Sequence, residues 1–301
     1  TRFYELRSGQ ILDLAEQLKI NKITGGRAVV AGNILSGKMD IFAANERGKN
    51  FLYYNSDGYF QDIAEDYKVD DQYENGRGTT LTDIFYRGRL DIVTSNWNGY
   101  HRAFVLEDNK FRDIATPTYN IPTRIRTVIS ADFDNDGYDE IFMNNIGEPN
   151  KLFKIKENGF FEEINIKNAY EANGLGTGAA VADIDDDGIL ELLIAHGESG
   201  MQPLTMYKAD IKKDFNYLRI KPLNKFGAPA RGATVILKSN LRNHAKTIDA
   251  GSGYLCQMEP VAHYGIRDGE KNISIKIIWT NGFTETLNIN ELNKTIEVTQ
   301  K

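Results

Sequence analysis

Two short stretches of this chain concentrate carboxylates at alternating positions. Each has three aspartates at every second position, then a glycine, then a glutamate: Asp132, Asp134, Asp136, Gly137 and Glu140 in the first, and Asp183, Asp185, Asp187, Gly188 and Glu191 in the second. Like charges repel, by about 1 kcal/mol at ~4 Å even in water. A calcium ion reverses that sign because it takes roughly six to eight oxygen ligands, and the glycine permits the sharp turn around it.

The chain around these stretches differs from an EF-hand. That motif needs a glutamate at its twelfth position, which here holds Met143 in one stretch and Ile194 in the other. A short apolar run follows each stretch and is typical of a buried strand. We therefore predict two Ca²⁺ sites in loops between β-strands, with the backbone carbonyls of Tyr138 and Ile189 as further ligands. The alternative, a solvated acidic turn without metal, fits one copy more easily than two.

Composition narrows the classes of partner. The formal net charge is −6 and no block of Lys and Arg stands out, which argues against nucleic acid. No apolar run approaches the ~20 residues of a membrane-spanning helix, so we expect no transmembrane segment. Cys256 is the single cysteine, so no internal disulfide forms. An oxidising compartment stays open, because bound calcium can stabilise a fold in place of disulfides.

The acidic stretches belong to an internal repeat of about 50 residues. Its copies share a turn glycine and a closing acid: Gly37 and Asp40, Gly88 and Asp91, Gly137 and Glu140, Gly188 and Glu191. A strand–turn–strand module alternates with these loops at 3–20, 52–69, 104–121 and 152–170. Four strands per repeat predict a small all-β propeller over residues 1–212, with four blades, or five if surplus strands form a composite blade. We expect those surplus strands, 3–20 and 203–209, to close the ring.

The acids are not evenly distributed over the copies. The first copy has no acid at the first three ligand positions, and the second keeps only Asp83, with Arg87 at the third. We expect both loops to be metal-free. The guanidinium of Arg87 would stand where the cation stands elsewhere and would neutralise Asp83 or Asp91.

The repeat ends after residue 211. Beyond it, alternating strands separated by turns predict a second all-β domain over residues 213–301. Within it, residues 249–266 contain three glycines, with Cys256 and His263 seven residues apart. This pair suggests a metal site or a nucleophile. A buried free cysteine and a packed histidine are favoured, because no acid is placed to orient the histidine.

These motifs resemble known families. The pattern D-x-D-x-D-G-x-x-[DE] followed by a strand resembles the FG-GAP/VCBS repeats of integrin-type propellers. "GSGYL", "HYG" and "W-x-x-G", in that order within residues 216–287, resemble the ASPIC/UnbV domain. The resemblance implies a propeller, calcium and a secreted, periplasmic or cell-surface setting, but no reaction. The chain departs from the pattern because two loops lack ligands, the propeller is short, and Cys256 replaces a small polar residue.

The propeller face opposite the calcium loops is the candidate ligand surface. Its loops carry aromatic and basic side chains that suit a glycan or a protein partner: Trp97, Tyr100, His101, Arg102, Arg77, Arg124 and Arg126. Two functions stay open. One is a calcium-stabilised binding or adhesion module, and the other is an enzyme acting in the central funnel on a polysaccharide or a small hydrophobic metabolite. His101 and His196 are the histidines in these face loops, and neither has a partner visible in the sequence, which favours binding.

Overall fold

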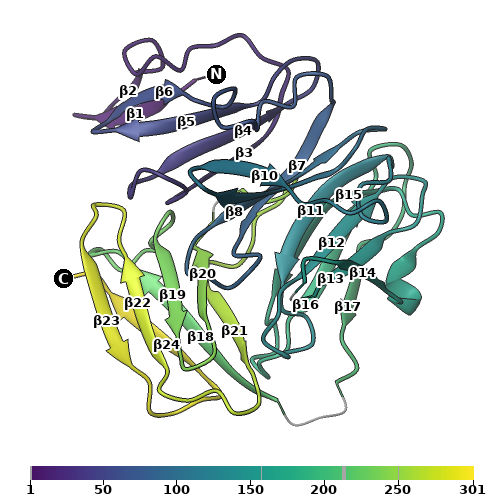
Figure 1. The fold of residues 1–301 in the computed structure, drawn as a ribbon, viewed down its shortest axis with the longest axis vertical. Coiled ribbons are helices and arrows are strands. Elements are labelled where there is room, and N and C mark those ends of the chain that lie inside the picture. The colour runs from purple at the N-terminus through teal and green to yellow at the C-terminus, as the bar shows by residue number, and fades with distance from the viewer. Residues whose placement is uncertain (1, 157, 212–214, 250) are drawn as a thin grey trace.

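The computed structural model describes residues 2–156, 158–211, 215–249 and 251–301. These residues form β-sheets, in which every pair of strands is antiparallel except β18 (Asn216–Leu223) with β24 (Lys294–Thr299), and a single short 3-10 helix, η1 (Lys167–Tyr170), so the all-β prediction is confirmed. Three four-stranded sheets and one three-stranded sheet follow one another along the chain as propeller blades. In Figure 1 they form an arc from the top of the view to its right side, and the C-terminal domain lies at lower left.

The blades repeat one strand order from the inside outward. The first two consist of β3 (Gly26–Gly32), β4 (Asp40–Asn45), β5 (Phe51–Ser56) and β6 (Tyr59–Asp62), then β7 (Gly76–Thr82), β8 (Asp91–Asn96), β9 (Arg102–Glu107) and β10 (Lys110–Asp113). The last two consist of β11 (Ile125–Ala131), β12 (Glu140–Asn145), β13 (Lys151–Ile155) and β14 (Phe161–Ile164), then β15 (Gly176–Ala182), β16 (Glu191–His196) and β17 (Thr205–Lys208).

The innermost strands pack side by side in the order β3, β7, β11, β15. Their approach is close enough to require glycine: a Cβ on Gly78 of β7 would lie 2.6 Å from the backbone nitrogen of Val128 on β11. Each inner strand also has a register shift near its start, and such bulges increase twist. Small residues and bulges thus let the blades converge.

The expected ring closure between the chain ends is wrong for the described residues. The N-terminal strands β1 (Tyr4–Arg7) and β2 (Gln10–Asp13) pair with each other in a two-stranded sheet, and β17 pairs with β16. The hairpin packs against the first blade through Phe3, Leu18 and Phe60. It is the outer half of a blade, placed at the far end of the arc from β17 (Figure 1).

The C-terminal domain is a pair of packed sheets. One has the order β21–β18–β24 and the other β20–β19–β22–β23. Their bounds are β18 (Asn216–Leu223), β19 (Thr234–Lys238), β20 (Asn243–Thr247), β21 (Ala262–Ile266), β22 (Ser274–Ile278), β23 (Thr284–Asn288) and β24 (Lys294–Thr299). Trp279 and Tyr264 are buried in the core between them. The predicted boundary at 212/213 lies outside the described residues, between β17 and β18.

This domain packs on the blades along the inner strands. Gly253 and Thr79 of β7 exchange backbone hydrogen bonds, at 2.6 and 3.3 Å. Further along, Thr127 of β11 donates its hydroxyl to the carbonyl of Tyr254 at 3.0 Å. The segment from 251 to 261 therefore occupies the inner side of the arc, and the domain covers the blade ends that carry the acidic loops.

Candidate metal centres and the opposite face

The first acidic loop gathers its aspartates around one point. Carboxylate oxygens of Asp132, Asp134 and Asp136 lie within 4.8 Å of one another. One oxygen of Asp132 accepts the backbone N–H groups of Gly137 and Gly265, at 2.9 and 3.0 Å. Its other oxygen, Oδ1, is buried and has no hydrogen-bond partner among the described residues. A buried carboxylate oxygen without a donor is costly unless a cation is bound.

Glu140 adds a second buried carboxylate to this loop. Burial, together with the charge of Asp132, raises the pKa of Glu140 well above its usual value, and burial raises the pKa of Asp132 to about 7. The ammonium of Lys154, opposite Glu140 on β13, contacts Asp136 and lies 3.6 Å from Glu140. One ammonium supplies less charge than three aspartates and a glutamate carry.

The second acidic loop repeats this arrangement. Oxygens of Asp183, Asp185 and Glu191 lie within 4.8 Å of one another. The ammonium of Lys208, opposite Glu191 on β17, lies 2.8 Å from Asp185 and 2.5 Å from Glu191, and also 2.8 Å from Asp187. As in the first loop, the buried Oδ1 of the first aspartate has no hydrogen-bond partner in the described part of the chain.

Both clusters therefore have the donor set of a metal site. The ligands are oxygen atoms, which suit hard divalent cations. The unpaired Oδ1 atoms of Asp132 and Asp183 are the observation that fits a bound ion. The sequence predicted these acids, and the structure brings them together, with Lys154 and Lys208 as neighbours that sequence reasoning missed.

The loops of the first two blades make the same turn, but hydrogen-bond donors of the protein itself satisfy their acids. In the first, the carboxylate of Asp40 accepts the backbone N–H groups of Leu35, Ser36 and Asn55, at 2.7–2.9 Å. In the second, Asp83 accepts four backbone N–H groups, those of Arg87, Gly88, Arg89 and Ala245. Arg87 also lies 3.9 Å from Asp91, one of the two acids that it is predicted to neutralise. Donors within the protein satisfy these acids.

The C-terminal domain contacts the acidic loops directly, which sequence reasoning missed. Arg219 pairs with Asp183 at 2.7 Å, and His263 lies 2.6 Å from the side-chain oxygen of Asn135. Asp139 is buried and pairs with Lys246 at 2.7 Å. The available signal was a break in the repeat, because the place of Asp139 is apolar in the other copies: Met39, Leu90 and Leu190.

Electrostatics make this contact specific. Burial opposes ionisation of Asp139, but Lys246 and His244 hold its pKa well below the usual range. Burial also lowers the pKa of His263 to about 3, so its ring is neutral. His263 therefore has a packing role at the domain contact, as the sequence favoured.

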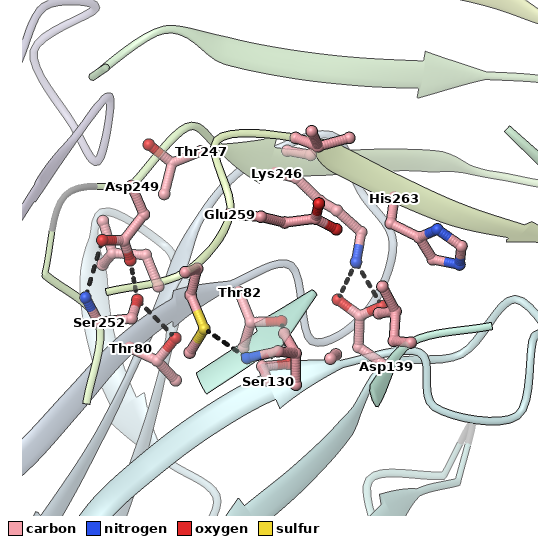
Figure 2. A pocket seen from close by; sticks show the side chains of 17 residues that line it. Thr80, Thr82, Ser130, Asp139, Lys246, Thr247, Asp249, Ser252, Glu259 and His263 are labelled. Atoms are coloured by element: carbon pink, nitrogen blue, oxygen red, sulfur yellow. Dashed lines mark hydrogen bonds and ion pairs between the residues drawn. The ribbon is translucent and has the colours of Figure 1, made fainter. Parts of the chain in front are cut away.

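The space between the inner strands and the C-terminal domain is a cavity of about 70 Å³. Figure 2 shows Lys246 and Asp139 paired on one side, and Asp249, Ser252 and Thr80 linked by hydrogen bonds on the other. Small-molecule sites are usually about 300–1,000 Å³, so this space suits a few water molecules. Among its ionisable groups, Lys246 pairs with Asp139, and Glu259 pairs with Arg219, which lies outside the lining.

On the face opposite the acidic loops, two arginines lie against the ring of Trp97. The guanidinium of Arg126 lies 4.2 Å from the Trp97 ring centroid and that of Arg77 lies 5.4 Å from it. Tyr100, in the same loop, is 53% exposed. This cation–π cluster joins Trp97, in the loop after β8, to arginines near the starts of β7 and β11, and holds the Trp97 ring in one orientation.

Two of the predicted ligand-binding side chains are not accessible. Arg77 is buried and pairs with Glu46 at 3.0 Å. His101 is fully buried, accepts the backbone N–H of Asn96 at 3.2 Å, and lies 3.1 Å from the hydroxyl of Thr123. Burial lowers its pKa to about 4. Both side chains lie beneath the surface. The prediction that they contact a ligand directly is therefore wrong.

The remaining arginines are held in ion pairs. Arg124 pairs with Glu148 at 3.0 Å, and Arg126 with Glu198 at 2.6 Å. Arg102 contacts three carboxylates, the nearest being Asp71 at 2.9 Å. The accessible part of the face is therefore Trp97, Tyr100 and Arg124, bordered by paired charges.

Comparison with known proteins agrees with this architecture. The FG-GAP-like repeat family matches residues 83–143 and 132–194, and the ASPIC and UnbV family matches residues 224–301. The chain is an FG-GAP repeat protein with a C-terminal ASPIC/UnbV domain. The resemblance noted in the sequence is thereby confirmed.

Curated relatives extend the match over most of this FG-GAP repeat protein. Cartilage acidic protein 1 of Xenopus tropicalis is 45% identical over 95% of this chain and 47% of its own length. The Homo sapiens protein of the same name is 44% identical over 95% of this chain and 46% of its own length. The chain thus spans about half the length of these relatives.

A solved structure, a mutant of AofleA from Arthrobotrys oligospora, is similar with a TM-score of 0.40 and 9% identity over 92% of this chain and 91% of that one. A likeness this low carries no argument about fold or function. Within the described residues, no helix is long and apolar enough to cross a membrane.

Proposed function

We propose that this protein is a calcium-stabilised binding module that acts outside the cytoplasm, secreted, periplasmic or on the cell surface. Two Ca²⁺ ions would bind, one to Asp132, Asp134, Asp136, Glu140 and the carbonyl of Tyr138, the other to Asp183, Asp185, Asp187, Glu191 and the carbonyl of Ile189. The unpaired buried oxygens of Asp132 and Asp183 carry this part of the proposal. The ions would neutralise loops on which the C-terminal domain packs.

The partner, a glycan or a protein, would bind to the face opposite these loops. The C-terminal domain covers the loop side, so the opposite face is the one that stays accessible. An aromatic ring fixed by stacked guanidinium groups offers a flat surface at little entropic cost. Trp97, with the exposed Tyr100 and Arg124, supports recognition of a sugar ring or a peptide plane.

The experiment compares exposed tyrosines on the two faces. Tyr100 is 53% exposed, and Tyr59, the first residue of β6 at the acidic-loop end of the first blade, is 61% exposed. Wild type, Tyr100→Ala and Tyr59→Ala are applied in calcium to a glycan array and a protein array. The proposal expects Tyr100→Ala to weaken the wild-type signal about tenfold or more, with Tyr59→Ala unchanged.

Trp97→Ala should weaken the same signal while the calcium-dependent melting transition remains. Equal loss in Tyr100→Ala and Tyr59→Ala would place the site on another face. An unfolded Trp97→Ala protein would show that this ring is a core residue, and Tyr100→Ala would then decide alone.

A further inference from the structure

The first aspartate of a loop connects that loop to the C-terminal domain in three of the blades. Its Oδ2 atom accepts the N–H of the turn glycine: Asp83 from Gly88 at 2.7 Å, Asp132 from Gly137 at 2.9 Å and Asp183 from Gly188 at 3.0 Å. A donor of the C-terminal domain reaches the same three Oδ2 atoms: Ala245 N–H at 3.0 Å, Gly265 N–H at 3.0 Å and the Arg219 guanidinium at 2.7 Å. Loop closure and domain packing therefore share one oxygen in each of these blades.

Two of these donors are backbone groups on the edge strands of the C-terminal sheets. Ala245 lies on β20 and Gly265 on β21, and each strand is the outermost of its sheet. N–H and C=O of one residue point to the same side of an antiparallel strand. The carbonyl of Gly265 accepts from Arg242 at 2.5 Å, and not from β18. Solvent exchange of these two N–H groups therefore reports on contacts with the loops, and not on pairing within a sheet.

The other carboxylate oxygen, Oδ1, separates the second blade from the third and fourth. In Asp83 it accepts the N–H of Arg87 at 2.8 Å. In Asp132 and Asp183 it is buried and has no partner among the residues that the structure describes. Protein donors thus hold both oxygens of Asp83, whereas the two acid-rich loops fix Oδ2 and leave Oδ1 for an ion.

Arg219 reaches the fourth-blade loop as half of a buried ion pair. Its side chain is 4% exposed and lies 2.6 Å from Glu259 as well as 2.7 Å from Asp183. Glu259 also accepts the backbone N–H of Asp183 at 3.3 Å. Because Glu259 offsets the charge of Arg219, the pair adds little net charge beside the acids. Its main effect is to fix the direction of the Asp183 carboxylate, as groups around a metal ligand generally do.

Asn135 joins the two acid-rich loops to each other and to the same domain. It stands between Asp134 and Asp136 in the chain. Its side-chain amide donates to the carbonyl of Gly188 at 2.6 Å, and its side-chain oxygen accepts from His263 at 2.6 Å. A shift of either loop would therefore disturb contacts of the C-terminal domain.

We propose that Gly265 and Arg219 are positioning groups of the two calcium sites, so that ion binding and docking of the C-terminal domain on the third and fourth blades strengthen each other. The inference rests on the calcium binding proposed above. Each group fixes the first ligand through Oδ2, and the ion fixes the same carboxylate through Oδ1. Linkage makes the effect reciprocal, because a domain that raises the affinity for an ion is held more tightly once that ion is bound. Docking on the second blade needs no ion.

Amide hydrogen exchange of the 301-residue chain, followed by NMR in calcium and in chelator, compares two matched contacts. Gly265 N–H and Ala245 N–H each donate to the Oδ2 atom of a first aspartate at 3.0 Å. We expect chelation to speed exchange of Gly265 at least about fivefold more than exchange of Ala245. A general loss of stability would speed both alike, so equal changes, or no change, would overturn the inference.

A paired replacement tests the positioning role at the fourth blade. Arg219→Gln with Glu259→Gln removes the buried ion pair, alters no ligand and keeps the net charge. By calcium titration calorimetry it should weaken one of the two sites by about tenfold or more and the other by less. The control is Lys221→Gln with Glu297→Gln, which removes an ion pair of 2.6 Å further along β18 and should leave both affinities unchanged.

A single substitution tests the third blade. A Cβ added to Gly265 would lie 2.3 Å from Oδ2 of Asp132, so Gly265→Ala displaces that carboxylate while every ligand keeps its identity. We expect the site that the paired replacement spares to lose about tenfold or more in affinity. If either variant does not fold in calcium, amide exchange of the wild type decides alone.

The outcomes distinguish this inference from the calcium binding on which it rests. A wild-type titration with no calcium site would overturn both. Two calcium sites whose affinities stay unchanged, or become tighter, in the Arg219 and Gly265 variants would keep calcium binding and overturn the positioning role.

Discussion

The loops of the first two blades and those of the last two share one backbone turn and differ in what neutralises their acids. In the second blade, four backbone N–H groups surround Asp83. In the third and fourth, acids outnumber the available donors, and Asp132 and Asp183 each keep a buried oxygen unpaired. The difference shows that a repeat can keep its fold while a loop changes from internally satisfied to dependent on a cation.

The third strand of each blade also differs between the first two blades and the last two. Lys154 and Lys208 face the closing glutamates of the acid-rich loops, and the corresponding residues in the first two blades are Tyr54 and Val105. An ammonium therefore accompanies the acid-rich loops only. In the absence of a divalent ion it reduces the repulsion among the carboxylates, and it would compete with that ion for the same oxygens.

Of the experiments that test this comparison, calcium removal should have the largest effect on stability. An ion at a hundredfold excess over its Kd stabilises the folded state by about 2.7 kcal/mol per site. With two sites, chelation should lower the melting temperature by about 10 °C. Calorimetry in calcium and in chelator, with metal analysis beforehand, provides the check. An unchanged melting temperature in a metal-free protein would remove the distinction between the loop pairs.

Matched substitutions should distinguish the acid-rich loops of the last two blades from the internally satisfied loops of the first two. Asp132→Asn should remove one ion and about half of the chelator effect, roughly 2.7 kcal/mol, and Asp132→Asn with Asp183→Asn should remove all of it. Asp83→Asn is the control, because it should destabilise the protein by about 1–3 kcal/mol through lost hydrogen bonds and keep the chelator effect whole. Calcium titration calorimetry counts the sites. A reduced ion count in Asp83→Asn would contradict the assignment.

The internally satisfied loop should respond to pH. Burial raises the pKa of Asp91 from 3.8 to about 7 in the folded protein. Between these values the folded state binds the proton more tightly, so the contribution of Asp91 to stability is greatest below about pH 4 and is lost as pH rises through 7. Relative to Asp91→Asn, the wild type should lose about 1–3 kcal/mol between pH 5 and pH 8. Urea unfolding at both pH values measures this, and a constant gap would refute it.

The smallest effect concerns the lysines. Lys208→Gln should lower stability in chelator by less than about 1 kcal/mol, because the side chain is partly exposed. It should also tighten calcium binding by a few fold, because a competing charge is removed. Lys246→Gln is a poor control, since Lys246 pairs with buried Asp139, so Lys110→Gln on the outer strand of the second blade serves instead. Weaker calcium binding in Lys208→Gln would make this lysine a supporting group.

Local patterns in the sequence determined the repeat, the strands and the ligand set. Aspartates at every second position followed by Gly137 or Gly188 define a loop by covalent spacing alone, and the apolar run after each loop defines a strand by its period. These features depend on residues close together in the chain.

Tertiary structure decided what lies against those loops and which side chains stay accessible. Asp139 and Lys246 are 107 residues apart, and their pairing depends on where the C-terminal domain packs. His101 looked available in a polar loop but is buried, and its ring is hydrogen-bonded to Thr123 and Asn96. Contacts of this kind arise from packing between distant segments, and no local spacing encodes them.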